Sequence, residues 1–348
     1  MNLLGLKQKI AHDVGIDLGT ANTLVWVKGQ GIVINEPSVV AINSKTKHVL
    51  AIGSKAKAMI GRTPNGIQAA RPLVDGVVSN YEITEHMLKY FLEKVQQKYP
   101  VLWPHPRVVV GLPSGVTEVE KRAVEQATIS AGARQVYLIE EPMAAAIGVS
   151  LPVKDARGSM IIDIGGGTTE VAVMSLGGIV VSRSLRIAGD EITESIMQFA
   201  RDEHNLYIGE ATAESIKLTI GRVFPSSKTK SIKVRGRNLV SGLPEEIKIT
   251  NDQIRSMLTK QVRPIVEAIK TTLEESPPEL VADIAEDGIT LVGGGSQLKG
   301  LDKLIEQETK LKVKVPSNAL SAVVEGCGLV LDNTNDLKEI LVTTGYKS

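Results

Sequence analysis

The chain has 348 residues, of which 43% are hydrophobic and 23% are charged, a composition typical of a globular protein with one or two domains and a sizeable core. Its 40 basic and 39 acidic residues leave a net charge of +1, which argues against nucleic acid as a partner because phosphate-backbone binding needs a basic excess or stripe. The single cysteine, Cys327, excludes an internal disulfide framework and is typical of a reducing compartment. No apolar run approaches the roughly 20 residues that span a bilayer, and no signal-peptide pattern is present, so we expect a cytoplasmic protein.

The first ten residues place Leu3, Leu6 and Ile10 on one face of a helix, with lysines nearby. A short amphipathic segment of this kind could lie in a membrane interface. Gly5 weakens that interpretation, so a frayed tail remains the alternative.

Three short apolar runs, each ending in a glycine cluster, predict buried strands that deliver flexible loops to one edge of a sheet. The runs are Val14–Leu18 before Gly19, residues 160–164 before Gly165, Gly166 and Gly167, and Ile289–Val292 before Gly293, Gly294 and Gly295.

Helical patterns lie between these runs. Residues 117–131 predict one helix, in which Thr117 is the N-cap, Glu120 completes a capping box and Gly132 is the stop. The alternation of strands and helices indicates an α/β architecture.

A longer helical pattern covers Asn251–Glu275. We expect it to be interrupted at Pro264, because proline removes a backbone donor and clashes with the preceding turn. Pro277 and Pro278 close it.

An internal repeat relates the first two glycine loops. Residues 17–27 align without gaps to residues 163–173, with Asp, Gly, Thr and two valines in common. Each copy then runs through a Gly-containing turn into a segment that begins Gly-Ile-Val, at Gly31 and at Gly178. A fold with two similar halves is the simplest explanation.

Glycine-rich turns between strands expose backbone N–H groups that can cradle phosphate. Asp17 and Asp163 each precede such a turn, and two carboxylates facing one triphosphate predict a hydrated Mg²⁺ between them. Either copy alone would be interpreted as an ordinary hairpin turn, but the repeated pair behind apolar strands favours nucleotide binding. The polar side chains expected to add contacts are Thr20, Asn22, Thr23, Thr168 and Thr169.

Two other schemes for binding phosphate find no match. The chain has no Gly-x-x-x-x-Gly-Lys-Ser/Thr loop, and the cluster that begins at Gly293 lacks the last glycine of a dinucleotide fingerprint. The basic tract at residues 225–242 is interpreted as a solvated face with small strands rather than a nucleic-acid site.

Five motifs, in one order over nearly the whole chain, resemble the ATPase superfamily of actin, heat-shock chaperones and sugar kinases. Residues 17–23 resemble its first phosphate motif, 140–148 its first connecting helix, 163–170 its second phosphate motif, 291–296 its adenosine motif and 325–331 its second connecting helix. Within the superfamily, residues 31–39, 71–77, 141–146 and 276–280 resemble the MreB-like bacterial actins.

The resemblance implies an actin-like α/β fold with two similar lobes, each with a mixed sheet flanked by helices, and the nucleotide in the cleft between them. The implied subdomains are IA (1–35, 75–155 and 325–348), IB (36–74), IIA (156–190 and 255–324) and IIB (191–254).

The resemblance also implies roles for single residues. Asp17 and Asp163 would hold Mg²⁺ through water, and Thr168 would lie near the γ-phosphate. Glu141 would position the attacking water, with Glu140 as the competing candidate, so the implied catalytic set is Glu141, Asp163 and Thr168.

The implied ATP contacts come from the glycine loops and one helix. Glu214 and Lys217, which alone would be an exposed ion pair, match a ribose- and base-contacting pair, and the cluster at Gly293 could otherwise be a helix-entry turn. The full set is Gly19, Thr20, Ala21, Asn22, Gly165, Gly166, Gly167, Thr168, Glu214, Lys217, Gly293, Gly294, Gly295 and Gln297.

By resemblance, the chain is a slow ATPase that binds ATP or ADP with Mg²⁺ and polymerises with itself into double filaments. Its expected place is the cytoplasmic face of the inner membrane, with lipid and the membrane proteins of cell-shape and wall synthesis as partners. Leu102 and Trp103 lie in a Pro-bounded loop that we interpret as a membrane contact, with a buried loop anchor as the alternative. A small-molecule kinase or a chaperone-like ATPase of the same fold is the alternative function.

Overall fold

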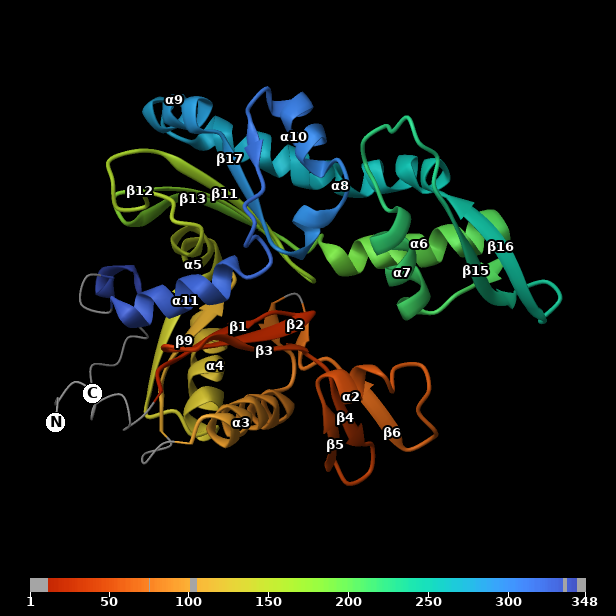
Figure 1. Cartoon of the computed structure of the whole chain (residues 1–348), viewed down its shortest axis with the longest axis horizontal. Helices are drawn as coiled ribbons and strands as arrows, with labels where there is room; N and C mark the ends of the chain where they lie inside the picture. The colour runs from red at the N-terminus through yellow and green to blue at the C-terminus, as the bar shows by residue number, and fades with distance from the viewer. Residues whose placement is uncertain (1–11, 75, 101–104, 334–336, 343–348) are drawn as a thin grey trace. The chain divides into compact units, whose positions relative to one another are not determined.

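The computed structural model describes residues 12–74, 76–100, 105–333 and 337–342 (Figure 1). The chain divides into two compact units. The first contains Met1–Arg157, Met174–Val180 and Leu320–Ser348, and the second contains Gly158–Val173 and Val181–Ala319.

The first unit is built on a five-stranded mixed sheet with the order β10-β9-β1-β2-β3. Its strands are β1 (Val14–Leu18), β2 (Asn22–Val27), β3 (Gly31–Pro37), β9 (Arg107–Leu112) and β10 (Gln135–Glu140). Strand β1 pairs antiparallel with β2 and parallel with β9, and β10 is parallel to β9. The central strands are therefore buried on both faces, which explains their nearly continuous apolar sequence.

Helices cover both faces of this sheet. Side chains of β1 such as Ile16 pack with α3 (Tyr81–Lys98) and α4 (Glu118–Ser130) in one apolar core. On the other face, Gly15 approaches α11 (Ala322–Asp332), which packs against α5 (Glu141–Gly148). Because successive strand residues point to opposite faces, Asp17 lies on the same face as Gly15, toward α11.

The first unit also contains two small elements, besides the 3₁₀ helix η2 (Lys338–Ile340). One is a three-stranded sheet, ordered β5-β4-β6, with the short helix α2. The other is the hairpin β7–β8. Their bounds are β4 (Val40–Asn43), β5 (Val49–Ile52), α2 (Ser54–Lys57), β6 (Ile67–Ala70), β7 (Leu73–Val74) and β8 (Val77–Val78).

The second unit repeats the sheet of the first. Its order is β13-β12-β11-β17-β18, with β11 parallel to β17 and β17 parallel to β18. The strands are β11 (Ser159–Ile164), β12 (Thr169–Ser175), β13 (Gly178–Leu185), β17 (Ile289–Val292) and β18 (Val313–Lys314), and the end of β12 and the start of β13 lie in the segment Met174–Val180 that is grouped with the first unit. The order of the first sheet, taken from its other edge, is β3-β2-β1-β9-β10, so that β1 corresponds to β11 and β2 to β12. The sequence repeat is therefore also a structural duplication.

The rest of the second unit is helical, with one small sheet ordered β14-β15-β16. Its elements are α6 (Gly189–His204), β14 (Leu206–Tyr207), α7 (Glu210–Ile220), β15 (Ser231–Asn238), β16 (Pro244–Thr250), α8 (Asn251–Glu275), α9 (Pro278–Asp287), the 3₁₀ helix η1 (Gly294–Gln297) and α10 (Leu301–Thr309). Side chains of α6, α7, α8 and the main sheet share one apolar core.

The local predictions for α4 are confirmed. Thr117 and Glu120 form a reciprocal capping box, and the helix ends before Gly132, whose φ is +114°. The sequence pattern had the right start because capping is a contact between neighbours in the chain.

The prediction that Pro264 interrupts the long helix is wrong, because α8 runs unbroken from Asn251 to Glu275. A proline inside a helix costs about 3 kcal/mol, whereas each buried aliphatic side chain contributes about 1.5–3 kcal/mol. The buried apolar residues on either side of the proline are Ile254, Leu258, Val262, Ile265, Val266 and Ile269. Their combined burial outweighs the lost hydrogen bond.

Along the described residues, no helix combines the length and the apolar character needed to cross a membrane.

Candidate functional site

The first glycine loop joins β1 to β2 in the first unit. Position 19 in this loop requires glycine, because a Cβ on Gly19 would lie 2.7 Å from the carbonyl oxygen of Asn22. Asp17 stands one residue before the end of β1, beside Gly111 of β9. The strand register therefore places a carboxylate at the base of a tightly curled loop.

Ser38 anchors this loop. Its hydroxyl donates to the carbonyl oxygen of Gly19 at 2.6 Å and lies 2.8 Å from the Thr23 hydroxyl, and its backbone N–H donates to the carbonyl of Ala21 at 3.0 Å. Ser38 is fully buried. No local sequence pattern indicated Ser38, although the pairing of Asn22 with Pro37 in the β2–β3 hairpin brings the next residue beside the loop.

A second anchor is Gly76, whose N–H donates to the Thr20 hydroxyl at 2.9 Å. Gly76 has a φ of +72°, a conformation that L side chains rarely adopt. No local sequence pattern indicated this contact, because residues 20 and 76 lie far apart in the chain.

Two of the threonines expected to contact phosphate are used inside the protein instead. Thr23 and Thr169 are fully buried. The Thr23 hydroxyl bonds Ser38, and the Thr169 hydroxyl donates to the carbonyl of Ile187 at 2.7 Å. Both side chains support the backbone of their loops and are not free to meet a ligand.

The second glycine loop follows β11 in the second unit. The Gly165 N–H donates to the carbonyl of Thr168 at 2.8 Å, which closes a tight turn. The carbonyl oxygens of Gly165 and Gly166 accept hydrogen bonds from the first two N–H groups of α6, at Gly189 (3.2 Å) and Asp190 (2.8 Å). The N-terminus of α6 thus fixes the loop through backbone atoms alone.

The third glycine cluster lies directly on the second loop. Gly293 has a φ of +78°, and a Cβ there would collide with the Asp163 carboxylate and the Ile164 carbonyl. A Cβ on Gly295 would collide with the Ile164 side chain. Since β17 is parallel to β11, with Val292 opposite Asp163, the two loops leave the sheet side by side. Only glycine permits this approach.

The remaining members of the third cluster are open to solvent. Gly294 and Gln297 are exposed, and a Cβ on Gly294 would meet nothing. Ser296, which the sequence analysis did not single out, donates to the carbonyl of Gly293 at 2.7 Å and so holds the turn.

Burial raises the pKa of Asp163 from 3.8 to about 7. A buried carboxylate of this kind is stabilised in its charged form by a nearby cation, and carboxylate oxygen is a donor that Mg²⁺ prefers. Gly293 and Gly295, where a Cβ would collide with Asp163 or Ile164, leave backbone close to the carboxylate. These residues fit a hydrated magnesium ion with a phosphate. Among the described residues no group of three or more His, Cys, Asp or Glu side chains is placed to hold a metal.

Glu214 and Lys217 on α7 form an ion pair at 2.7 Å within a larger network. The Thr193 hydroxyl donates to Glu214 at 2.7 Å, and the Lys217 ammonium donates to the Gly189 carbonyl at 2.9 Å. Since Gly189 also donates to the second loop, the network links α7 through α6 to the turn at Gly165. The pair is therefore more than an exposed surface contact, and Thr193 is a member that sequence reasoning missed.

Glu141 and Glu140 occupy different environments at the start of α5. Glu141 is 8% exposed, and its side chain lies against Gly111, where a Cβ would be 3.4 Å from its Cγ. Burial and then the negative charges of Asp17 and Glu141 raise the pKa of the Cys327 thiol, so both carboxylates lie near that buried side chain. The structure thus brings Asp17 and Glu141 together in the first unit.

Glu140 points elsewhere. Burial raises its pKa, while Lys121 and the Ser114 hydroxyl, 3.5 Å away, act in the opposite direction. Its partners belong to α4 and to the loop that precedes α4. The competing candidate therefore does not share the surroundings of Asp17.

The residues expected to contact a membrane, Leu3, Leu6, Leu102 and Trp103, lie outside the described residues. Their role stays a prediction.

The chain matches the family model described as "MreB/Mbl protein" over residues 11–339. It is 49% identical over 326 residues to the cell shape-determining protein MreB of Escherichia coli (strain K12), covering 92% of this chain and 94% of the relative. It is 46% identical over 327 residues to the cell shape-determining protein Mbl of Bacillus subtilis (strain 168), covering 94% of this chain and 98% of the relative.

Solved structures agree with the sequence comparisons. The structure of MreB5 of Spiroplasma citri bound to ADP matches with a TM-score of 0.89 and 38% identity, over 95% of this chain and 99% of that one. A MamK double helical filament matches with a TM-score of 0.79 and 20% identity, over 92% of this chain and 99% of that one, which shows a shared fold. The expected actin-like α/β fold is confirmed.

Proposed function

The chain belongs to the MreB/Mbl family of cell shape-determining, actin-like proteins, and from this premise we propose that it binds ATP with Mg²⁺, hydrolyses it slowly and polymerises into filaments. The observation that carries the proposal is the duplicated sheet, in which β1 and β11 each deliver an aspartate followed by a glycine loop. Solved MreB5 structures bound to ADP and to AMPPNP, at 38% and 37% identity, support a nucleotide as the ligand.

We assign the phosphates to the two glycine loops and the nucleoside to the third cluster. The backbone N–H groups of residues 19–22 and 166–168 are the donors for phosphate oxygens. Gly293, Gly294, Gly295 and Gln297 approach the adenosine, and Glu214 with Lys217 contacts its ribose and base. Thr168 remains the candidate beside the γ-phosphate, since the hydroxyl of the neighbouring Thr169 is already used.

We assign the metal to Asp17 and Asp163, which hold it through water. A magnesium ion held by these two carboxylates would supply positive charge to neutralise the phosphate during hydrolysis. Glu141 orients the attacking water and accepts its proton, because it is a nearly buried carboxylate that shares its surroundings with Asp17. Glu140 is engaged with Ser114 and the positive field of Lys121, so we assign it no part in hydrolysis.

The subdomain division of the family is proposed for this chain as well. Subdomain IB corresponds to the small sheet β5-β4-β6 and its neighbours, and IIB to α6, α7 and the sheet β14-β15-β16.

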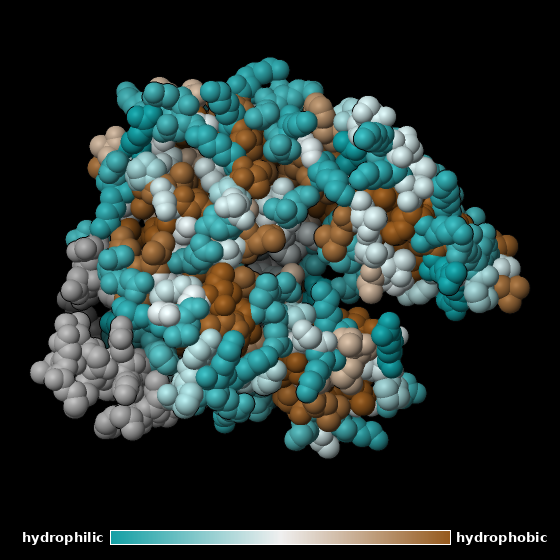
Figure 2. Space-filling model, in the orientation of Figure 1, coloured by the Kyte–Doolittle hydropathy of each residue, from teal (hydrophilic) through white to brown (hydrophobic). Residues whose placement is uncertain are grey.

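An exposed apolar tip on the β15–β16 hairpin supports self-association. Leu239, Val240 and Leu243 are 44%, 82% and 65% exposed, and Figure 2 shows hydrophobic surface at this end of the hairpin. The Asn238 side chain accepts from the backbone N–H groups of Val240 and Ser241, each at 2.8 Å, so the tip has a fixed shape. A preformed apolar surface of this kind is a typical protein contact site, and we propose a second copy of the chain as its occupant.

We further propose that the filament is double, lies on the cytoplasmic face of the inner membrane through Leu3, Leu6, Leu102 and Trp103, and guides the membrane proteins of cell-shape and wall synthesis. Support for this part comes from the family and from the apolar character of those side chains.

Sedimentation of the purified protein tests the filament proposal. We expect pelleting with ATP and Mg²⁺, co-sedimentation with anionic liposomes, and phosphate release without any acceptor substrate. A protein that stays monomeric with ATP, Mg²⁺ and anionic lipid would contradict polymerisation. Nucleotide binding is tested separately by titration with a fluorescent ATP analogue, so the two parts can fail independently.

A further inference from the structure

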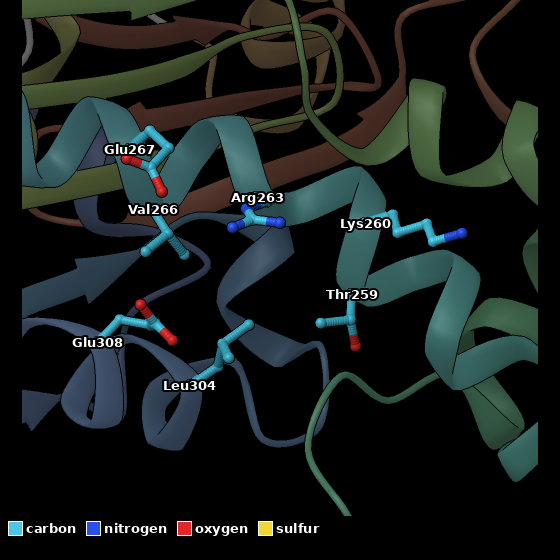
Figure 3. A pocket seen from close by; sticks show the side chains of 7 residues that line it. All are labelled: Thr259, Lys260, Arg263, Val266, Glu267, Leu304 and Glu308. Atoms are coloured by element: carbon cyan, nitrogen blue, oxygen red, sulfur yellow. The ribbon is translucent and has the colours of Figure 1, made fainter.

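A pocket of about 280 Å³ lies between α8 and α10 in the second unit (Figure 3). Its volume is close to the lower limit of small-molecule sites, about 300 Å³. Val266 and Leu304 supply its apolar surface, with Leu304 directed into the space between the helices. The other lining residues are Thr259, Lys260, Arg263, Glu267 and Glu308.

The two carboxylates of this α8–α10 pocket already have a partner. Lys270 lies 2.7 Å from Glu308 and 4.0 Å from Glu267. The hydrogen bond from Lys270 is the largest cause of the lowered pKa of Glu308, so this carboxylate is ionised and neutralised within the protein. The acidic end of the pocket is therefore closed by an internal ion pair.

The two cations at the other end form no ion pair of this kind, although the charge of Arg263 also contributes to the lowered pKa of Glu308. Among the described residues, neither Lys260 nor Arg263 forms a hydrogen bond or an ion pair with another side chain. Both are exposed, and Figure 3 shows Lys260 extending along α8 away from the carboxylates. An exposed guanidinium that makes no hydrogen bond within the described residues, beside a cavity, offers paired N–H donors to a planar or tetrahedral anion.

More positive charge gathers beyond the Thr259 end of the pocket. The Thr259 hydroxyl donates to the Val223 carbonyl at 3.0 Å, and the Val223 N–H donates to the Lys299 carbonyl at 3.1 Å, which ties this edge to a basic loop. After burial, the charges of Lys230 and Arg222 lower the pKa of Lys299, so three like charges lie close together there. Such a cluster raises the local potential for an anion.

We propose that the α8–α10 pocket binds a small organic phosphate, with the phosphate at Arg263 and Lys260 and the apolar body on Leu304 and Val266. Arg263 provides the directional hydrogen bonds, Lys260 adds a second charge, and the apolar surface distinguishes an organic phosphate from inorganic phosphate. None of the residues that line the pocket, which come from α8 and α10, is among those assigned to the nucleotide.

The test uses phenyl phosphate as the probe on the full chain saturated with ADP and Mg²⁺, followed by ligand-observed NMR and calorimetry. We expect one binding event, with a dissociation constant at least ten times higher in Arg263→Gln, because the charge-assisted hydrogen bonds are lost. Leu304→Ala should weaken phenyl phosphate but leave the weaker binding of inorganic phosphate unchanged. Phenol, which has the body without the charge, should not bind.

Lys303→Gln is the matched control, because it removes one positive charge from an exposed position on α10 that does not line the pocket. Its affinity for phenyl phosphate should equal that of the wild type. Equal affinity in Arg263→Gln, displacement of the probe by excess ATP, or equal affinities for phenyl and inorganic phosphate would each overturn the proposal. Arg263 is exposed, so its substitution leaves the core of the unit intact.

Discussion

Replacing Ser38 with alanine removes one buried hydroxyl that serves both the first glycine loop and the β2 strand. The hydroxyl donates to the Gly19 carbonyl and bonds the Thr23 hydroxyl. Each hydrogen bond contributes about 1 kcal/mol net, and a buried carbonyl left without a donor costs about 1–3 kcal/mol. We therefore expect the free energy of unfolding of the first unit to fall by about 2–4 kcal/mol.

Part of that loss should appear as weaker nucleotide binding, because Gly19 belongs to the loop assigned to phosphate. If about 1.4 kcal/mol is lost from the loop geometry, the dissociation constant for ATP rises about ten-fold. The measurements are urea unfolding with and without ATP and titration with a fluorescent ATP analogue.

Ser79→Ala is the control for this change. Its exposed hydroxyl also donates to a backbone carbonyl, that of Pro72 at 3.0 Å, but it has no contact with the loop. We expect wild-type affinity for ATP in this variant. A Ser38→Ala protein with the affinity and stability of the wild type would refute the assignment of Ser38 as the anchor of the loop.

Three further predictions test the proposed machinery. Glu141→Ala should keep ATP binding and lower phosphate release by roughly 10²-fold or more, whereas Glu140→Ala should stay within a few-fold of wild type; equal loss in both would contradict the assignment. The pKa of Asp163 in the folded state is raised to about 7, so the folded state binds more protons than the unfolded state between about pH 4 and pH 7. The contribution of Asp163 to the free energy of unfolding therefore falls as pH rises through this range. Asp163→Asn should remove that decline in the nucleotide-free protein, measured by urea unfolding at about pH 5 and about pH 8. The same variant should abolish the Mg²⁺ dependence of ATP binding. An unchanged pH profile or an unchanged Mg²⁺ titration would count against the role of Asp163. Val240→Asp should prevent ATP-dependent pelleting without changing ATP affinity, and normal pelleting would exclude the hairpin tip as the contact.

Local sequence patterns predicted the strands and loops well. The apolar runs Val14–Leu18 and Ile289–Val292 are strands β1 and β17, and the repeat correctly indicated two similar halves. These features could be predicted because burial on both faces demands an unbroken apolar run, and a sharp exit from a strand demands glycine. The same local reasoning placed the capping box at Thr117.

Interactions between distant segments could not be predicted in this way. Nothing near Thr20 in the chain indicates that its hydroxyl accepts from residue 76, and nothing near Glu214 indicates Thr193 as its partner. At Pro264 the local rule gave the wrong answer, since the buried face of α8 is stabilised by contacts with other elements of the core. Tertiary burial decided the structure there and overrode the backbone preference.

The two duplicated loops are held by different kinds of contact, although their sequences align without gaps. The first depends on the side chain of Ser38 and on the Gly76 N–H, which come from segments after β3 and around β7–β8. The second depends on the first two backbone N–H groups of α6, which any residue except proline can supply. The first loop is therefore coupled through a specific hydroxyl to the small sheet that follows Ser38, while the second is coupled to α6 and, through Gly189 and Lys217, to α7. The duplication preserved the strand order but left each glycine loop in contact with a different set of elements. A substitution in the first loop should therefore affect the small sheet that follows Ser38, whereas a substitution in the second should affect α6 and α7.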